Sequence, residues 1–424
     1  MIIIFRIFCY TIGMKYDLIV IGGGPAGLMA AGHAAENGAA VLLLEKRNRL
    51  GIKLSITGQG RCNITNAEFD DRKLIKKYGQ NGKFLFPIFH KFGPQEIINF
   101  FEERNIKTKI ERGNRVFPVS DRSDSVIKAL VKYLRENNVT IKTSAAVKSI
   151  VLENKKITKV VLQNGEEFIA EKYAICTGGQ AYPQTGSTGD AYAWLKKMGH
   201  KIITPEQALV PVIVGERWVK LLEGLSLKNV VISVYQKGRK IVSEFGEAIF
   251  TDNGLSGPIV IDMSKKIGQL LKNGEVELQI DYKPALSFVE LDQRVQKDFS
   301  ELHNKQFKNS LQALLPRLLI PVIINLSKIN PDKKVSAITR EERKTLVHLL
   351  KNFKLRVKAL AGFDRAIVTS GGVDLREIDP RTMQSKIIAN LYLAGEVIDI
   401  DGPTGGYNLQ VCWSTGYCVG DNFK

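Results

Sequence analysis

Two stretches near the start of the sequence carry the residues best suited to chemistry. Residues 22–27 read GGGPAG, and residues 51–66 read GIKLSITGQGRCNITN, with three more glycines, an arginine, a cysteine and two asparagines. Glycines let a backbone approach a ligand closely because they have no side chain. Arginine and asparagine supply hydrogen-bond donors, and a thiol can give up a proton. The two stretches therefore predict a nucleotide-binding turn followed by a polar loop that contacts a bound group.

The glycine turn has the surroundings that a dinucleotide site needs. Residues 17–21 and 41–44 are apolar strand patterns, and residues 28–37 between them form an alanine-rich helix pattern. A GxGxxG turn between such a strand and helix is the fingerprint of dinucleotide binding. The pyrophosphate is expected at the helix N-terminus, where free N–H groups favour negative charge. Glu45 ends the second strand and is placed to accept a hydrogen bond from a ribose hydroxyl.

The glycines of this turn have separate predicted roles. Gly22 permits the tight turn, Gly24 lets the backbone approach the pyrophosphate, and Gly27 lets the helix pack on the strand. Ala26 and Lys46 belong to the same set of predicted cofactor contacts.

The polar loop after the second strand favours FAD over NAD. A nicotinamide-binding domain usually continues with another plain β-α repeat, whereas residues 46–66 form a long polar segment. Such a loop can run under a flavin ring and offer it backbone donors. Arg61, Asn63 and Asn66 are expected to bind polar atoms of the flavin or of a substrate. The predicted cofactor contacts in this loop are Lys46, Gly58, Gly60, Arg61, Cys62 and Asn63.

Cys62 is the first candidate for a catalytic acid. It follows Arg61, whose charge would lower the pKa of the thiol. A thiol beside a flavin can protonate the carbon next to the one that receives hydride. The alternative is a small buried residue that fills space. Tyr407 and His200 are weaker candidates for the catalytic acid.

Two later strand patterns return the chain to the same site. The first ends in Thr177, Gly178 and Gly179, as expected where a strand passes the adenine side of a dinucleotide. The second, residues 391–394, precedes a glycine loop and a helix that opens near residue 408. Asp399 or Asp401 in this loop would approach the ribityl and phosphate region, and the helix N-terminus would face the flavin. The predicted contacts here are Gly395, Glu396, Asp401, Gly405, Gly406, Tyr407 and Asn408.

Several separated blocks together resemble one family. They begin at residues 22, 57, 115, 173, 246, 369 and 391 and read GGGPAG, TGQGRCNITN, RVFPVSDRS, YAICTGGQAYPQTGSTGD, GEAIFTDNGLSGP, TSGGV and LYLAGEVIDIDGPTGGYNLQVCWSTG. From about residue 16 to the C-terminus, the sequence resembles the BaiN/RdsA-like flavoproteins, a set of bacterial FAD-dependent oxidoreductases. The resemblance implies a flavin domain, a β-barrel-like substrate domain, a small helical domain and reduction of a conjugated C=C bond.

The resemblance leaves the substrate open. One branch of the family is associated with dihydrouridine formation in ribosomal RNA, and another with enone reduction in steroid-like bile acids. The net charge of +18, from 61 basic and 43 acidic residues, favours the RNA substrate, because basic proteins attract polyanions. The alternatives are a small α,β-unsaturated carbonyl compound, and a non-catalytic flavoprotein that binds RNA. No second nucleotide fingerprint appears, so the electron donor is either NAD(P)H bound transiently over the flavin or another protein.

The predicted fold class is α/β, with a discontinuous Rossmann-like FAD-binding domain at residues 14–200 and 360–424. Residues 201–286 show alternating strand patterns between Gly and Asn turns, which predict an inserted β-barrel-like domain. Residues 287–359 change to a helical period with a basic excess, including a helix pattern that runs through residues 341–357. These residues predict a small helical domain.

Other features narrow the class of protein. No apolar run is long enough for a transmembrane helix. The five cysteines and five histidines show no metal-ligand spacing. The cysteines also form no disulfide pattern, so they fit reduced thiols in a cytoplasmic protein. Residues 1–13 are expected to be an extension upstream of a start at Met14.

Overall fold

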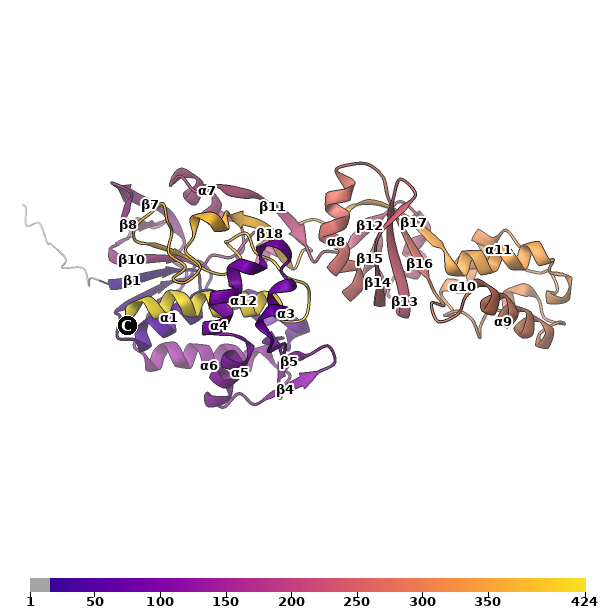
Figure 1. Ribbon diagram of the computed structural model, residues 1–424, viewed down its shortest axis with the longest axis horizontal. Coiled ribbons are helices and arrows are strands. Elements are labelled where there is room, and N and C mark those ends of the chain that lie inside the picture. Colours follow the sequence, from indigo (N-terminus) through magenta and orange to yellow (C-terminus); the bar gives the residue numbers. More distant parts are fainter. Residues whose placement is uncertain (1–15) are drawn as a thin grey trace, which may run out of the picture. The chain divides into compact units, whose positions relative to one another are not determined.

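The computed structural model describes residues 16–424, which form two compact units. The first unit comprises residues 16–206 and 368–424, and the second comprises residues 207–367. The extension expected at residues 1–13 and the start expected at Met14 lie outside the described residues. The colours of Figure 1 show how the C-terminal part of the chain returns to the first unit.

A five-stranded parallel sheet forms the centre of the first unit. Its order is β19-β10-β1-β2-β6, and every pairing is parallel. Short apolar runs suit such strands, because both faces of a parallel sheet are covered. The segments after parallel strands meet at one edge, where ligands bind in this class of fold. This sheet confirms the predicted Rossmann-like α/β class. The strands are β1 (Tyr16–Ile21), β2 (Val41–Leu44), β6 (Thr140–Lys142), β10 (Ala170–Ile175) and β19 (Leu391–Leu393).

Helices α1 (Pro25–Glu36) and α12 (Tyr407–Gly420) pack closely together in the first unit (Figure 1). A Cβ on Gly416 would lie 2.3 Å from the carbonyl oxygen of Ala26, and a Cβ on Gly420 would lie 2.7 Å from the Cβ of His33. Only glycine at these positions allows such a close approach of the two helices. The last helix of the chain is thereby fixed against the first.

The remaining elements of the first unit surround this centre. Two small sheets have the orders β3-β5-β4 and β7-β8-β9, and β11 pairs with β18. The strands are β3 (Thr65–Asn66), β4 (Thr108–Glu111), β5 (Arg115–Pro118), β7 (Val147–Glu153), β8 (Lys156–Leu162), β9 (Glu167–Phe168), β11 (Ile202–Ala208) and β18 (Val368–Val373). The helices are α2 (Ile52–Ile56), α3 (Asp71–Lys76), α4 (Phe86–Lys91), α5 (Pro94–Glu103), α6 (Ser123–Glu136) and α7 (Asp190–Lys197).

The second unit is built on a closed six-stranded barrel. Its order is β12-β15-β14-β13-β16-β17, and all pairings are antiparallel. Alternate residues of β13, β16 and β17 are buried in the core of this unit, together with one face of α8. The elements are β12 (Val212–Val214), β13 (Ser226–Gln236), β14 (Arg239–Phe250), β15 (Gly254–Ser256), α8 (Pro258–Leu271), β16 (Val276–Asp281) and β17 (Phe353–Leu360).

Three helices lie between β16 and β17 along the chain. They are α9 (Phe288–Glu301), α10 (Leu319–Ser327) and α11 (Arg340–Lys351), and Arg343 of α11 binds Asp292 of α9 at 2.7 Å. The predicted helix through residues 341–357 is wrong beyond residue 351, because Phe353–Leu360 is strand β17 of the barrel. Its residues alternate between buried and exposed, and β12 and β16 pair with it on its two sides.

No helix within residues 16–424 is both long and apolar enough to cross a membrane. Across the same residues, no group of three or more His, Cys, Asp or Glu side chains is arranged to hold a metal ion.

Candidate active site

The glycine turn between β1 and α1 lies at the carboxyl edge of the parallel sheet. Gly22 has a φ of +110°, and a Cβ there would lie 2.5 Å from the carbonyl oxygen of Cys176. A Cβ on Gly27 would lie 1.9 Å from the carbonyl oxygen of Gly22, so the turn requires both glycines. Gly24 differs, because its φ is −84° and a Cβ would meet nothing within 4 Å. The space beside Gly24, at the start of α1, is therefore open to a ligand.

Side chains after β2 and β10 suit a nucleotide at this edge. Glu45, which follows β2, accepts the N–H of Gly23 at 2.7 Å and is thereby held against the turn. Lys46 pairs with Asp190 at 2.7 Å. Thr177 follows β10, and its buried hydroxyl oxygen has no hydrogen-bond partner. A buried hydroxyl without a partner is costly, so this atom fits a polar group of a bound cofactor.

The segment from 51 to 66 contains a short helix, α2, followed by left-handed backbone. Gly58, Gln59, Gly60 and Cys62 have φ values of +56°, +59°, +84° and +63°. Non-glycine residues rarely adopt this conformation, and those that do cluster at functional sites. A backbone wound in this way presents its N–H groups in several directions, which suits contact with a flat ring.

The structure changes the interpretation of Arg61 and Cys62. Arg61 donates hydrogen bonds to Glu111 at 2.9 Å and to Asp121 at 3.3 Å, and its guanidinium carbon lies 3.9 Å from the centroid of the Phe117 ring. The carboxylates therefore neutralise its charge. Cys62 is fully buried, and burial raises the pKa of its thiol to about 12. This shift is opposite in direction to the sequence-based prediction.

The end of this segment meets the C-terminal glycine loop. Gly406, with a φ of +99°, lies so close that a Cβ there would be 2.3 Å from the carbonyl carbon of Thr65. Asn66 donates a hydrogen bond to the carbonyl of Gly405 at 3.1 Å. With its amide oxygen turned toward α12, Asn63 accepts the N–H of Gly406 at 3.0 Å. The two polar segments predicted to contact the cofactor are thus in direct contact.

Glu396, which follows β19, forms contacts that the sequence did not predict. Its carboxylate pairs with Lys53 of α2 at 2.9 Å and accepts the N–H of Thr369 at 2.8 Å. The hydroxyl of Thr369 accepts the N–H groups of Gln180 and Ala181 at 2.8 and 3.0 Å. Lys53 and Thr369 are therefore candidate site residues that sequence reasoning missed. The only signal was that Lys53 lies in the polar stretch at residues 51–66 and that Thr369 begins the TSGGV block.

Other predicted contacts support the backbone of the site. The side chain of Asn408 accepts the N–H of Gly402 at 2.8 Å and donates to its carbonyl at 2.9 Å, which fixes the loop before α12. Tyr407 is buried, and its carbonyl accepts a hydrogen bond from the Tyr78 hydroxyl at 2.9 Å. The remaining predicted residues occupy the first turn of α1 and the turns that follow β10 and β19: Ala26, Gly178, Gly179, Gly395 and Asp401.

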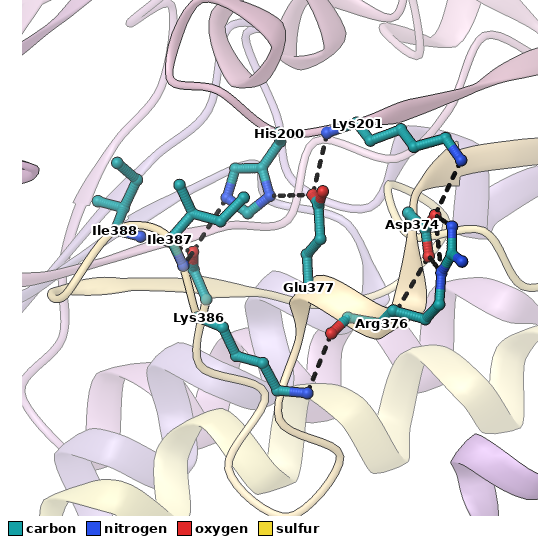
Figure 2. A network of polar contacts seen from close by, with 9 residues as sticks. His200, Lys201, Asp374, Arg376, Glu377, Lys386, Ile387 and Ile388 are labelled. Atoms are coloured by element: carbon teal, nitrogen blue, oxygen red, sulfur yellow. Dashed lines mark hydrogen bonds and ion pairs between the residues drawn. The ribbon is translucent and has the colours of Figure 1, made fainter.

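His200, a weaker candidate for the acid, belongs to a polar network in the first unit (Figure 2). Its Nδ1 lies 2.9 Å from Glu377 and its Nε2 lies 3.0 Å from the hydroxyl of Ser385. The order Ser-His-Glu is that of a hydrolase triad, but the serine oxygen is buried and accepts the N–H groups of Ile387 and Ile388. Burial lowers the pKa of His200. The network joins chain segments and has no accessible nucleophile.

The family profile described as HI0933-like protein Rossmann domain matches residues 16–422. The chain belongs to the HI0933-like family. This match and the full-length relatives described next confirm the resemblance to BaiN/RdsA-like flavoproteins. The protein is an FAD-dependent oxidoreductase, and its family supports reduction of a C=C bond. The open space at Gly24 and the unpartnered hydroxyl of Thr177 fit this cofactor.

Two curated relatives in this family match nearly the whole chain. The 3-dehydro-bile acid delta(4,6)-reductase of Clostridium scindens is 32% identical over 405 residues, which are 95% of this chain and 97% of that protein. The ribosomal RNA dihydrouridine synthase of Escherichia coli is 28% identical over 408 residues, or 96% and 98% of the two chains. A solved 3-ketosteroid-delta4-(5alpha)-dehydrogenase from Rhodococcus jostii RHA1 shares the fold, with a TM-score of 0.52, 13% identity, and coverage of 97% and 98%.

Proposed function

We propose that the protein reduces the C5=C6 bond of a uridine in ribosomal RNA, with NAD(P)H as the electron donor. The names of the two relatives, a delta(4,6)-reductase and a dihydrouridine synthase, both denote saturation of a C=C bond. Uracil carries such a bond in conjugation with a carbonyl. The observation that carries the choice of RNA is the net charge of +18, which suits a polyanionic substrate.

FAD, when bound, supplies hydride transfer from the reduced nicotinamide to the β-carbon of the substrate. The chain would hold this cofactor at the open space beside Gly24. It also places the N-terminus of α12, capped by Gly406, against residues 57–66, where the helix dipole favours negative charge. A proton must reach the neighbouring α-carbon, but Cys62, the sequence-based candidate for its donor, is fully buried and has no surface open to a substrate. Burial also raises the pKa of this thiol to about 12, so we assign Cys62 a packing role in the loop.

A row of cations on the barrel supports an RNA substrate. Along β17, Lys354, Arg356 and Lys358 are exposed, while the residues between them are buried. Alternate residues of a strand lie roughly 6.6 Å apart on one face, so the three charges form a line. Lys354 also forms an ion pair with Glu277, at 3.2 Å. Such a line can follow the phosphates of a nucleic acid strand.

The first experiment compares dihydrouridine in ribosomal RNA from cells with and without the gene. Loss of one modified site is expected on deletion, with rescue by the wild-type gene but not by a Gly24→Glu variant. A triple change of Lys354, Arg356 and Lys358 to Gln should lower modification at least about 10-fold in 0.15 M salt while flavin content is kept. The matched control removes Lys128 and Lys132 of α6, which are 77% and 71% exposed. Unchanged RNA after deletion would contradict the RNA substrate.

A small enone is the second candidate, and the 32% identity to a bile acid reductase favours it. Salt separates the two substrates, because phosphate contacts release counterions and small-molecule contacts do not. Raising salt from 50 to 200 mM should reduce RNA modification steeply. Turnover of a steroid enone that is insensitive to salt and to the triple change on β17 would support this second candidate.

A further inference from the structure

One segment of the first unit carries many cations and no acids. Residues 72–95 contain six lysines and arginines but no aspartate or glutamate, and the flanking acids are Asp71 and Glu96. The segment comprises most of α3, the 3-10 helix η2 (Gly79–Leu85) and α4. A surface with charge of one sign attracts ligands of the opposite sign, so this segment favours a polyanion.

Most of this charge is not neutralised by the protein. Four cations are exposed and form no ion pair or side-chain hydrogen bond within the part of the chain that the structure describes: Arg72, Lys76, Lys77 and Lys83. Arg72 and Lys76 are four residues apart on α3, where like charges repel each other. An anion bound over this face of the helix would remove the repulsion.

An exposed aromatic ring accompanies these cations. Phe86, the first residue of α4, is 43% exposed, whereas its neighbour Leu85 is fully buried. Side chains three residues apart in a 3-10 helix are eclipsed, so Phe86, at the C-terminal end of η2, lies on the same side as Lys83. The exposed ring therefore stands next to one of the unpaired cations.

The two helices that carry these groups are in close contact. A Cβ on Gly82 of η2 would lie 1.9 Å from the carbonyl oxygen of Ile75 in α3. Lys83 and Lys76 directly follow these two residues, so the charges of η2 and α3 belong to one surface. This surface is called the α3–α4 patch, and its residues are Arg72, Lys76, Lys77, Lys83 and Phe86.

Hydrogen bonds attach the α3–α4 patch to the proposed flavin site. The Tyr78 hydroxyl donates to the carbonyl of Tyr407 at 2.9 Å, and the side chain of Asn81 donates to the carbonyl of Asp399 at 2.7 Å. Both acceptors belong to the segment that includes the C-terminal glycine loop and the start of α12. Helix α4 also packs on α12 (Figure 1). A ligand on this patch would therefore lie close to the cofactor.

A single strand of RNA has the chemistry that this patch would recognise. An enzyme that acts on a base must take it out of the helical stack, so the RNA beside the target uridine is unpaired. Unpaired bases stack on aromatic rings while cations hold the phosphates. We propose that the α3–α4 patch binds a single-stranded segment of RNA, with phosphates on its cations and one base stacked on Phe86. The identity of the target base rests on the proposed function, but binding to the patch is measured separately.

Fluorescence anisotropy with a labelled oligouridylate of about 12 nucleotides tests the cations on the FAD-loaded protein. Lys76→Gln/Lys77→Gln should raise the Kd about 10-fold or more. It should also reduce the slope of log Kd against log salt by about 1.4, because each phosphate contact on a single strand contributes about 0.7. The matched control, Lys128→Gln/Lys132→Gln on α6, removes the same net charge and should change the Kd less than about threefold.

Variants of Phe86 test the stacked base. Phe86→Ala should raise the same Kd about 5-fold or more without changing the salt slope, because stacking releases no counterions. Phe86→Tyr keeps the ring and should bind within about twofold of wild type. The matched control is Phe245→Ala, since Phe245 is 58% exposed on β14, and it should leave the Kd unchanged. The flavin absorbance of each variant reports whether the cofactor site is intact.

The outcomes separate this proposal from the proposed function. Equal effects of the changes on α3 and on α6 would overturn the patch, because only net charge would then matter. Oligouridylate binding that ignores the patch variants, while these variants abolish binding to phosphatidylglycerol vesicles, would assign the patch to a lipid surface instead. Dihydrouridine that persists after deletion of the gene, with oligouridylate binding that still depends on the patch, would contradict the reduction of uridine and leave the RNA site standing.

Discussion

Replacing Gly24 with alanine should weaken the binding of FAD without lowering the stability of the apoprotein. Gly24 has a φ of −84° and a ψ of −176°, which alanine adopts freely, and the added methyl group would meet no atom within 4 Å. The apoprotein should therefore keep its stability or gain up to about 1 kcal/mol, because alanine narrows the unfolded ensemble. With FAD, the methyl group occupies space where the pyrophosphate is expected. Displacing an anion from a helix N-terminus costs about 2 kcal/mol, which raises the Kd for FAD roughly 30-fold.

Two measurements on the same protein check this reasoning. Urea unfolding of the apoprotein gives the stability, and titration with FAD followed by flavin fluorescence gives the Kd. Gly27→Ala is the matched control for damage to the fold, because its methyl group would lie 1.9 Å from the carbonyl oxygen of Gly22. It should destabilise the apoprotein by about 2 kcal/mol or more. An unchanged Kd for Gly24→Ala would refute the placement of the pyrophosphate, and a destabilised apoprotein would refute the open space.

Gly406→Ala should cost about 2–4 kcal/mol more stability than Gly38→Ala, as measured by urea unfolding. Both glycines have a positive φ, +99° and +95°, but only the first meets backbone, that of Thr65; equal losses would contradict this contact. Cys62→Ala should leave kcat within about twofold of wild type, because the fully buried thiol has no surface open to a substrate; a loss of about 100-fold with the flavin retained would show that this thiol donates the proton. Burial lowers the pKa of His200 below its ordinary value of 6.5, so the fold favours the neutral ring. The resulting stability is present above pH 6.5 and is lost as the pH falls. His200→Gln should therefore lose less stability than wild type between pH 7.5 and 5, measured by urea midpoints at both values; equal losses would show that His200 does not titrate on unfolding.

The parts of the fold that depend on local pattern could be predicted from the sequence. The glycine turn, the Ala-rich helix and the buried strands carry their signals within a few residues. Phe353–Leu360 shows why the sequence-based prediction of secondary structure was wrong in one segment. A single residue, Asn352, separates this strand from α11. The hydrophobic pattern therefore changes from a helical to a two-residue period with no intervening loop to mark the boundary. Its strand state depends on β12 and β16, which are distant in sequence, and a local pattern does not reveal such partners.

The same limit applies to the candidate site. Gly24 could be assigned a role because its neighbours along the chain define the turn. Arg61 was predicted to act on the thiol of Cys62 because the two residues are adjacent in the sequence. Its partners in the structure, Glu111 and Asp121, lie 50 and 60 residues further along the chain. The ion pair of Lys53 with Glu396 spans 343 residues. Ion pairs of this kind are decided by the folded topology, so the type of a residue indicates its chemistry but not its partner.

The packing of α12 on α1 sets an order for the biosynthesis of the flavoprotein. During translation, the parallel sheet and the glycine turn leave the ribosome without the helix that Gly416 and Gly420 seat against α1. All of residues 207–367 must be synthesised before that helix appears, so the barrel unit can fold while the first unit still lacks its last strand and helix. With the cofactor contacts proposed above, capture of FAD is therefore a late event in the life of each chain. On the same proposal, a nascent chain stalled before residue 391 has no complete cofactor site, whatever the concentration of flavin around it.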